Sequence, residues 1–239
     1  MSTQSNDLSP GEHEPGGKSA ADRLKTVAVA AMSDTKTAGR DAGIQPTRGL
    51  VDMAMVERIV AEWPKMAQKS AREILGKYGA PNEAVESRLI WYENGPWKRT
   101  ICYRDEIPHH FPNPHSDTLE CVIDYQVPLE KVSEVLKFDG SVVVERTAGE
   151  VSSRCDMEAA NFLALNMVHE IVTGNMTAEQ ARDFLTETAA AYVVSRSAPH
   201  AERLMFDVPT GETSEKDHTT IAGAVVRQAA GKIKDVVVG

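Results

Sequence analysis

Aromatic residues are scarce in this chain and absent from both of its ends. Phe, Trp and Tyr make up 5% of the 239 residues, and none occurs before Trp63 or after Phe206. Aromatic side chains bury the most area per residue, so the packed core is predicted within residues 51–208. Residues 1–50 are rich in Ser, Gly, Thr, Asp and Pro and are predicted to be a disordered tail, because they cannot bury enough apolar surface to offset chain entropy. Residues 20–32 have the spacing of a short helix that would be marginal alone.

An excess of basic residues is also missing. Residues 51–208 contain 16 Lys and Arg against 25 Asp and Glu, so this region carries the whole net charge of −9. Binding to a phosphate backbone needs clustered Lys and Arg, and so does attraction to an anionic membrane surface. We therefore expect no nucleic-acid partner and no membrane-surface binding.

Cysteines and long apolar runs are few. The three cysteines are an odd number and lie far apart, which does not indicate a disulfide framework. No stretch approaches the roughly 18 consecutive apolar residues of a membrane span, and the start of the chain lacks a basic segment followed by an apolar one. No Gly-rich phosphate-binding loop is present either. These absences predict a cytoplasmic protein with free thiols and no membrane span.

The hydrophobic pattern of residues 51–208 predicts a single α+β domain. Asn94-Gly95 is a strong hairpin signal, and a second hairpin turn is expected at 147–149. We expect a mostly antiparallel sheet, built from two hairpins plus a central strand and covered by helices on one face. The predicted helices are 51–78 with a break near Pro64, 128–137, 156–174 and 178–195; the predicted strands are 88–92, 97–104, 118–127, 142–146, 150–153 and a possible edge strand at 203–208.

The C-terminal part of the chain is predicted to form a polar linker, 209–216, and a separate amphipathic helix, 217–239. Small aliphatic residues recur every fourth position in this helix and form one apolar stripe. Such a stripe has to be buried against something. Packing onto its own domain, self-association and binding of a protein partner all stay open.

One loop contains the only cluster of potential metal ligands in the sequence. His109, His110, His115 and Asp117 could hold Zn²⁺ or Fe²⁺, with a carboxylate completing a set of imidazoles. Neighbouring residues in an extended segment point opposite ways, so only one of His109 and His110 is expected to join His115. Glu120 could turn towards the same loop. The alternative is a Pro-rich connection whose imidazoles satisfy backbone groups.

Two further groups are weaker site candidates. Cys155 precedes a predicted helix, and the helix dipole together with Arg154 could lower the pKa of its thiol for nucleophilic catalysis. The alternative is an ordinary small buried residue. Trp91, Tyr92 and Trp97 flank the first hairpin turn and could form a ligand-binding stacking platform, although cross-strand core packing is the more common use of such residues.

Residues 77–81, ahead of the strand with Trp91, resemble the helix-to-hairpin opening of small β-lactamase-inhibitor-like lipoproteins, and no function is carried over from this short resemblance. The leading prediction is a non-catalytic binding or accessory module that recognises a protein partner or a small ligand. The alternative is a metal-dependent (Zn or Fe) enzyme or metal-binding protein that uses the His109–His115 loop. In that case Glu120 or Asp117 would accept a proton from metal-activated water.

Overall fold

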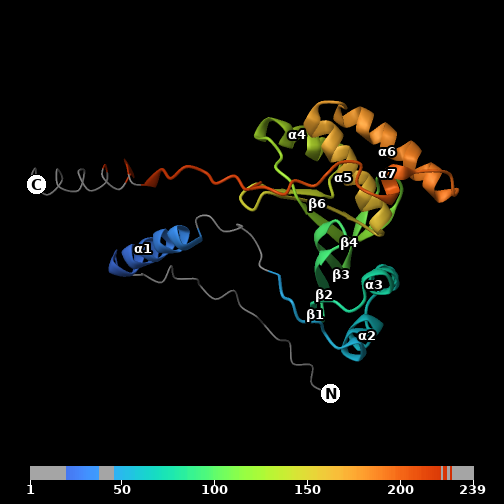
Figure 1. Ribbon diagram of the computed structural model, residues 1–239, viewed down its shortest axis with the longest axis horizontal. Helices are drawn as coiled ribbons and strands as arrows, with labels where there is room; N and C mark the ends of the chain where they lie inside the picture. The colour runs from blue at the N-terminus through green and yellow to red at the C-terminus, as the bar shows by residue number, and fades with distance from the viewer. Residues whose placement is uncertain (1–19, 38–45, 222, 225–226, 228–239) are drawn as a thin grey trace, which may run out of the picture. The chain divides into compact units, whose positions relative to one another are not determined.

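A computed structural model describes residues 20–37, 46–221, 223–224 and 227 (Figure 1). The chain divides into two compact units, Met1–Asp41 and Ala42–Gly239. The first unit contains helix α1 (Ala20–Thr37), whose described side chains at 21–33 are all exposed. The short helix predicted as possible over 20–32 is therefore present and longer. The rest of the predicted tail, residues 1–19 and 38–45, lies outside the described residues.

The second unit is an α+β domain built on a six-stranded antiparallel sheet of order β1-β2-β3-β4-β6-β5. This arrangement confirms the predicted fold class, with the β2–β3 and β5–β6 hairpins on either side of the central strand β4. Strand β1 was not predicted. The strands are β1 (Glu83–Val85), β2 (Arg88–Asn94), β3 (Trp97–His109), β4 (His115–Asp124), β5 (Val142–Glu145) and β6 (Glu150–Cys155).

The helices begin and end largely where local sequence signals place them. Asp52 caps its helix by accepting from the backbone N–H of Met55, and Pro64 separates two helices as predicted. Thr177 and Gln180 form a capping box, and Gly174 ends a helix with a left-handed backbone, φ 82°. The helices of this unit are α2 (Met53–Ala61), α3 (Lys65–Tyr78), α4 (Leu129–Phe138), α5 (Glu158–Thr173), α6 (Ala178–Val193) and α7 (Pro199–Glu202).

Two sequence predictions near α5 and α7 are wrong. The predicted helix 156–174 begins two residues later, at Glu158, and Met157 rather than Asp156 is its cap residue. Residues 203–208 do not form an edge strand. Their backbone is held instead by the buried side chain of Asn166, which donates to the carbonyl of Arg203 at 2.9 Å and accepts from the N–H of Met205 at 2.7 Å. A side chain that satisfies the backbone in this way replaces a strand partner.

One continuous hydrophobic core lies between the helices and one face of the sheet (Figure 1). Helix α5 contacts this face directly, because the Asn161 amide donates to the carbonyl of Leu119 at 3.1 Å. Helices α3 and α5 are joined at the core edge, where Glu158 accepts hydrogen bonds from the Tyr78 hydroxyl and from the Trp97 indole N–H. This shared carboxylate connects strand β3 to both helices.

The opposite face of the sheet is covered by its own polar side chains. Glu120, only 5% exposed, accepts hydrogen bonds from Tyr103, Ser152 and Arg154. The sequence predicts β4 as a half-buried strand, but the structure buries it on both faces from Asp117 to Ile123. The difference arises because polar side chains on this face, such as Glu120, are hydrogen-bonded to one another, and polar groups that are paired in this way can be buried.

The segment predicted as a linker packs on the β5–β6 turn. The Thr213 hydroxyl donates to the carbonyl of Gly149, and Arg146 pairs with Glu215 at 2.6 Å. A Cβ at Gly149 would meet the backbone of Thr213 at 2.2 Å, so the close approach requires glycine there. The predicted C-terminal helix 217–239 is wrong at its start, because residues 217–220 are not helical. Ile221, Gly223, Ala224 and Arg227 are helical, and residues 222, 225–226 and 228–239 lie outside the described residues.

Among the described residues, no helix combines the length and apolar character that a membrane span requires. This agrees with the sequence-based expectation.

Candidate functional site

The hairpin formed by β3 and β4 brings three of the predicted ligands together. Much of the predicted loop 105–117 belongs to these strands, and only residues 110–114 form the connection. His109 pairs directly opposite His115 in the ladder, and Asp117 follows two residues later on the same strand. Residues two apart in a strand share a face, and directly opposite residues are neighbours on that face. The two imidazole rings lie 4.9 Å apart and edge-on.

His109, His115 and Asp117 each offer one ligand atom, and these atoms all lie within 4.8 Å of one another. His115 Nε2 is 3.3 Å from Asp117 Oδ1, and His109 Nδ1 is 3.7 Å from the same oxygen. A tetrahedral Zn²⁺ with bonds of about 2.0–2.1 Å to N and O separates its ligand atoms by about 3.3–3.4 Å. The two distances to Asp117 Oδ1 are therefore close to those between the ligand atoms of a metal centre.

Each imidazole has one nitrogen facing Asp117 and the other beside an acceptor oxygen. His115 Nδ1 lies 2.8 Å from the carbonyl of Asn113, which can only accept, so this nitrogen donates and Nε2 is left facing Asp117. The Nε2 of His109 faces the carboxylate of Asp139 at 3.5 Å. A carboxylate or carbonyl on the far nitrogen is the usual outer support of a metal-binding histidine.

The two oxygens of the Asp117 carboxylate differ in their hydrogen bonding. The Ser141 hydroxyl donates to Oδ2, while Oδ1 is buried and accepts no hydrogen bond from any described residue. An unpaired charged oxygen in the interior is costly unless a cation compensates it. The carboxylate of Asp117, followed by the thiol of Cys155, raises the pKa of His115 to about 11. In the metal-free protein a proton on His115 supplies that positive charge, and a bound metal would displace it.

The structure excludes two of the predicted ligands from this group. His110 is exposed and points away from it, as the alternation of an extended segment predicts. Glu120 lies on the opposite face of the sheet, where its hydrogen bonds with Tyr103, Ser152 and Arg154 occupy both of its oxygens. The prediction that Glu120 turns towards the loop is therefore wrong.

The predicted aromatic platform is part of the core. Trp91 and Trp97 are 2% and 1% exposed, and their indole N–H groups donate to the carbonyl of Gly79 and to Glu158. Tyr92 is partly buried and its hydroxyl donates to Glu83 at 3.1 Å. The two tryptophans have no free ring face for a ligand. They pack in the core, which is the alternative predicted from the sequence.

Cys155 lies beside the group but does not belong to it. Its Sγ is 3.4 Å from His115 Nε2 and 3.5 Å from Asp156 Oδ1. Burial raises the pKa of the Cys155 thiol, and the nearby His115 offsets only part of this effect. The sequence-based expectation of a lowered thiol pKa is therefore not met, because burial outweighs the helix N-terminus.

Two residues of the site were missed in the sequence. Asp139 and Ser141 come from the turn between α4 and β5, and both are buried. Asp139-Gly140 gives a turn signal and no sign of a site. Burial raises the pKa of Asp139, although the backbone N–H of Ser141 donates to it at 2.8 Å. Only the pairing of β5 with β6 and of β6 with β4 brings this turn beside the histidines.

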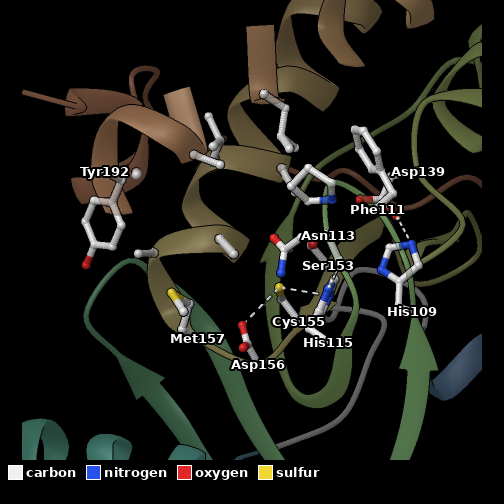
Figure 2. A pocket seen from close by; sticks show the side chains of 18 of the residues that line it. His109, Phe111, Asn113, His115, Asp139, Ser153, Cys155, Asp156, Met157 and Tyr192 are labelled. Carbon is white, nitrogen blue, oxygen red and sulfur yellow. Dashed lines mark hydrogen bonds and ion pairs between the residues drawn. The ribbon is translucent and has the colours of Figure 1, made fainter. Parts of the chain in front are cut away.

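A cavity of about 150 Å³ opens beside the metal-ligand group (Figure 2). His109, His115, Asp139 and Cys155 form part of its wall, whereas Asp117 lies behind them and does not line it. Figure 2 shows His115 and Cys155 at one side of the cavity, with Tyr192 and Met157 across from them. The remaining lining is mostly apolar and comes from helices α5 and α6, including Ala160, Leu163, Ala164, Leu185 and Ala189.

Comparisons of the chain with known protein families, with curated proteins and with solved structures found no match. The function proposed below is therefore based on the geometry of the site.

Proposed function

We propose that this protein binds a divalent transition-metal cation through His109, His115 and Asp117. The observation that carries the proposal is the buried Oδ1 of Asp117, which accepts no hydrogen bond from the described part of the chain and lies 3.3 Å and 3.7 Å from one nitrogen of each of two imidazoles. Each of those imidazoles has its other nitrogen beside an acceptor. A cation placed among these three atoms would satisfy all of them at once.

The ligand set favours Zn²⁺ or Fe²⁺ over Mg²⁺ and Ca²⁺. The latter two prefer six or more oxygen ligands, whereas two imidazoles and a carboxylate suit zinc and non-haem iron. Three protein ligands leave at least one coordination position for water or substrate, which is typical of catalytic rather than structural metal sites. The metal would then polarise a substrate or activate a water, and this chain's residues would hold and orient it.

The test is a zinc titration of chelator-stripped, full-length protein in competition with a chromophoric chelator. We expect one equivalent of Zn²⁺ to bind, and His115→Ala to lower the affinity by about 100-fold or more. His110→Ala is the matched control, since this neighbour is exposed and outside the group. Absence of stoichiometric zinc in the wild-type protein, or an equal loss in both variants, would refute the proposal.

A second candidate function, a thiol nucleophile, is favoured by the 3.4 Å contact between Cys155 Sγ and His115 Nε2 at the cavity wall. In this arrangement the protonated His115 would stabilise the thiolate of Cys155, and the carbonyl of Asn113 would orient the imidazole ring. The two functions compete, because a metal bound to Nε2 would displace the proton that stabilises the thiolate. A thiol enzyme requires rapid iodoacetamide alkylation of Cys155 that His115→Ala slows; alkylation no faster than that of a free model thiol would eliminate this candidate.

The wider predictions from the sequence are compatible with a metal-binding protein and stay predictions. These are recognition of a small ligand or a protein partner, self-association through the C-terminal helix and a cytoplasmic location.

A further inference from the structure

The cavity next to the candidate metal site is small, with one apolar end and one polar end. Its apolar end is formed by small and aliphatic side chains of α5 and α6, among them Ala160, Leu163 and Leu185. Its polar end is formed by His109, His115 and neighbouring polar groups (Figure 2). A ligand that fits this space has an apolar body and a polar head.

The volume limits the size of the body. Pockets for drug-sized ligands measure about 300–1,000 Å³, whereas an apolar cavity of about 150 Å³ in another protein accepts benzene. The cavity here has that smaller volume, about 150 Å³. Its occupant therefore has a body close to a single six-membered ring or a short branched chain.

The charges around the polar end determine the head group. Asp139, Asp156 and Arg154 line the cavity, and Asp117 is buried next to His115, so without a metal a carboxylate ligand would meet an excess of like charge. A divalent cation held at the site would offset this negative charge and offer an open coordination position. His109 and His115 line the cavity, whereas Asp117 is 5% exposed and does not, so we expect the open position on the cavity side.

We infer that the cavity binds a small carboxylic acid with a benzene-sized apolar body, whose carboxylate coordinates the metal. This inference rests on the proposed metal-binding function. Metal and carboxylate then stabilise each other's binding, and thermodynamic linkage requires the coupling to be equal in both directions.

Benzoate is the probe, and its binding is measured by calorimetry to the full-length protein with and without one equivalent of Zn²⁺. We expect zinc to tighten benzoate binding by at least about tenfold, within the usual range of coupling between sites. Toluene, which has the same ring and no carboxylate, should bind both forms equally. Benzoate that binds both forms equally, or neither, while zinc itself binds, would overturn the inference and leave the proposed function standing.

A pair of adjacent alanines in α6 provides the matched variants. Ala189 lines the cavity, whereas Ala190 is exposed and does not. Ala189→Leu should abolish benzoate binding and keep wild-type zinc affinity, and Ala190→Leu should change neither. Retained benzoate binding in Ala189→Leu would overturn the placement of the ligand in this cavity. A wild-type protein that binds no zinc would instead overturn the proposed function itself.

Discussion

Ser141 determines how the Asp117 carboxylate is presented to the two imidazoles. Its hydroxyl donates to Asp117 Oδ2 and lies 3.2 Å from His109 Nδ1, so it fixes one oxygen and leaves Oδ1 facing the histidines. Preorganised outer hydrogen bonds of this kind raise metal affinity by holding the ligands in place.

We expect Ser141→Ala to weaken zinc binding by about 10- to 100-fold, the usual effect of removing an outer partner of a metal ligand. The measurement is the same chelator competition. Ser133→Ala, at an exposed position of α4, is the control and should bind zinc like the wild type. Unchanged affinity in Ser141→Ala would show that Asp117 is held without it.

Individual site residues were predictable only where local geometry decided them. His115 and Asp117 could be grouped because they are close in the sequence, but their common face depends on β4 beginning at His115, three residues before the predicted strand 118–127. Alternation predicts that only one of His109 and His110 joins His115, and the strand pairing selects His109. Asp139 and Ser141 could not be predicted, because they reach the site only through strand pairing between segments distant in the sequence.

At the level of elements, the length of β3 decides the register of the site. The sequence predicts that this strand ends at residue 104, where charged residues and Pro108 interrupt the apolar pattern. The structure continues it to His109 past an irregularity in the ladder between Cys102 and Ile107. Such bulges re-aim side chains near functional sites, and the sequence pattern does not reveal them. The position of His109 opposite His115 depends on this irregularity in β3.

The face of the sheet away from the helices is stabilised by a buried ion-pair cluster. Arg99 donates two hydrogen bonds to Glu150, at 2.9 and 2.6 Å, and Lys98 lies 3.1 Å from the same carboxylate. Burial alone would raise the pKa of Glu150, but the hydrogen bonds and charges of Arg99 and Lys98 outweigh it and hold the pKa below its usual value.

Glu150→Gln is expected to lower the free energy of unfolding by about 3 kcal/mol at pH 7, because it leaves Arg99 buried without its partner charge. A lowered folded-state pKa stabilises the fold above the unfolded Glu pKa of about 4.3, and this contribution is lost as the pH falls through the lower folded value. Urea unfolding of both proteins between pH 7 and pH 3 should therefore show their difference shrinking in the acid range. The exposed Glu187→Gln should match the wild type throughout, and a constant difference for Glu150→Gln would contradict the assigned pKa shift.

At the level of the whole molecule, the fold class was predictable and the completed site was not. The 3.6- and 2-residue periodicities, the Asn94-Gly95 turn and the helix-ending glycines led to the correct α+β sheet with helices on one face. Those signals are local. The segment 209–216 was predicted as a polar linker because its contacts, such as that between Thr213 and Gly149, are with a turn more than sixty residues away in the sequence.

The domain as a whole places the candidate metal ligands on strands, and their supports on the neighbouring turn, next to one small cavity. Sites built on strands are held more precisely than sites on loops. The hairpin therefore supplies the ligands while α5 and α6 supply the apolar wall. In this arrangement the proposed metal site and the cavity adjoin each other and would act together.

A crystal structure of the zinc-loaded protein, with anomalous diffraction at the zinc edge, locates the metal directly. We expect one ordered zinc about 2.0–2.2 Å from Asp117 Oδ1, His115 Nε2 and His109 Nδ1, with an open position towards the cavity. Zinc bound elsewhere on the chain, or an ordered His109–His115–Asp117 group that holds no metal in the presence of excess zinc, would contradict it.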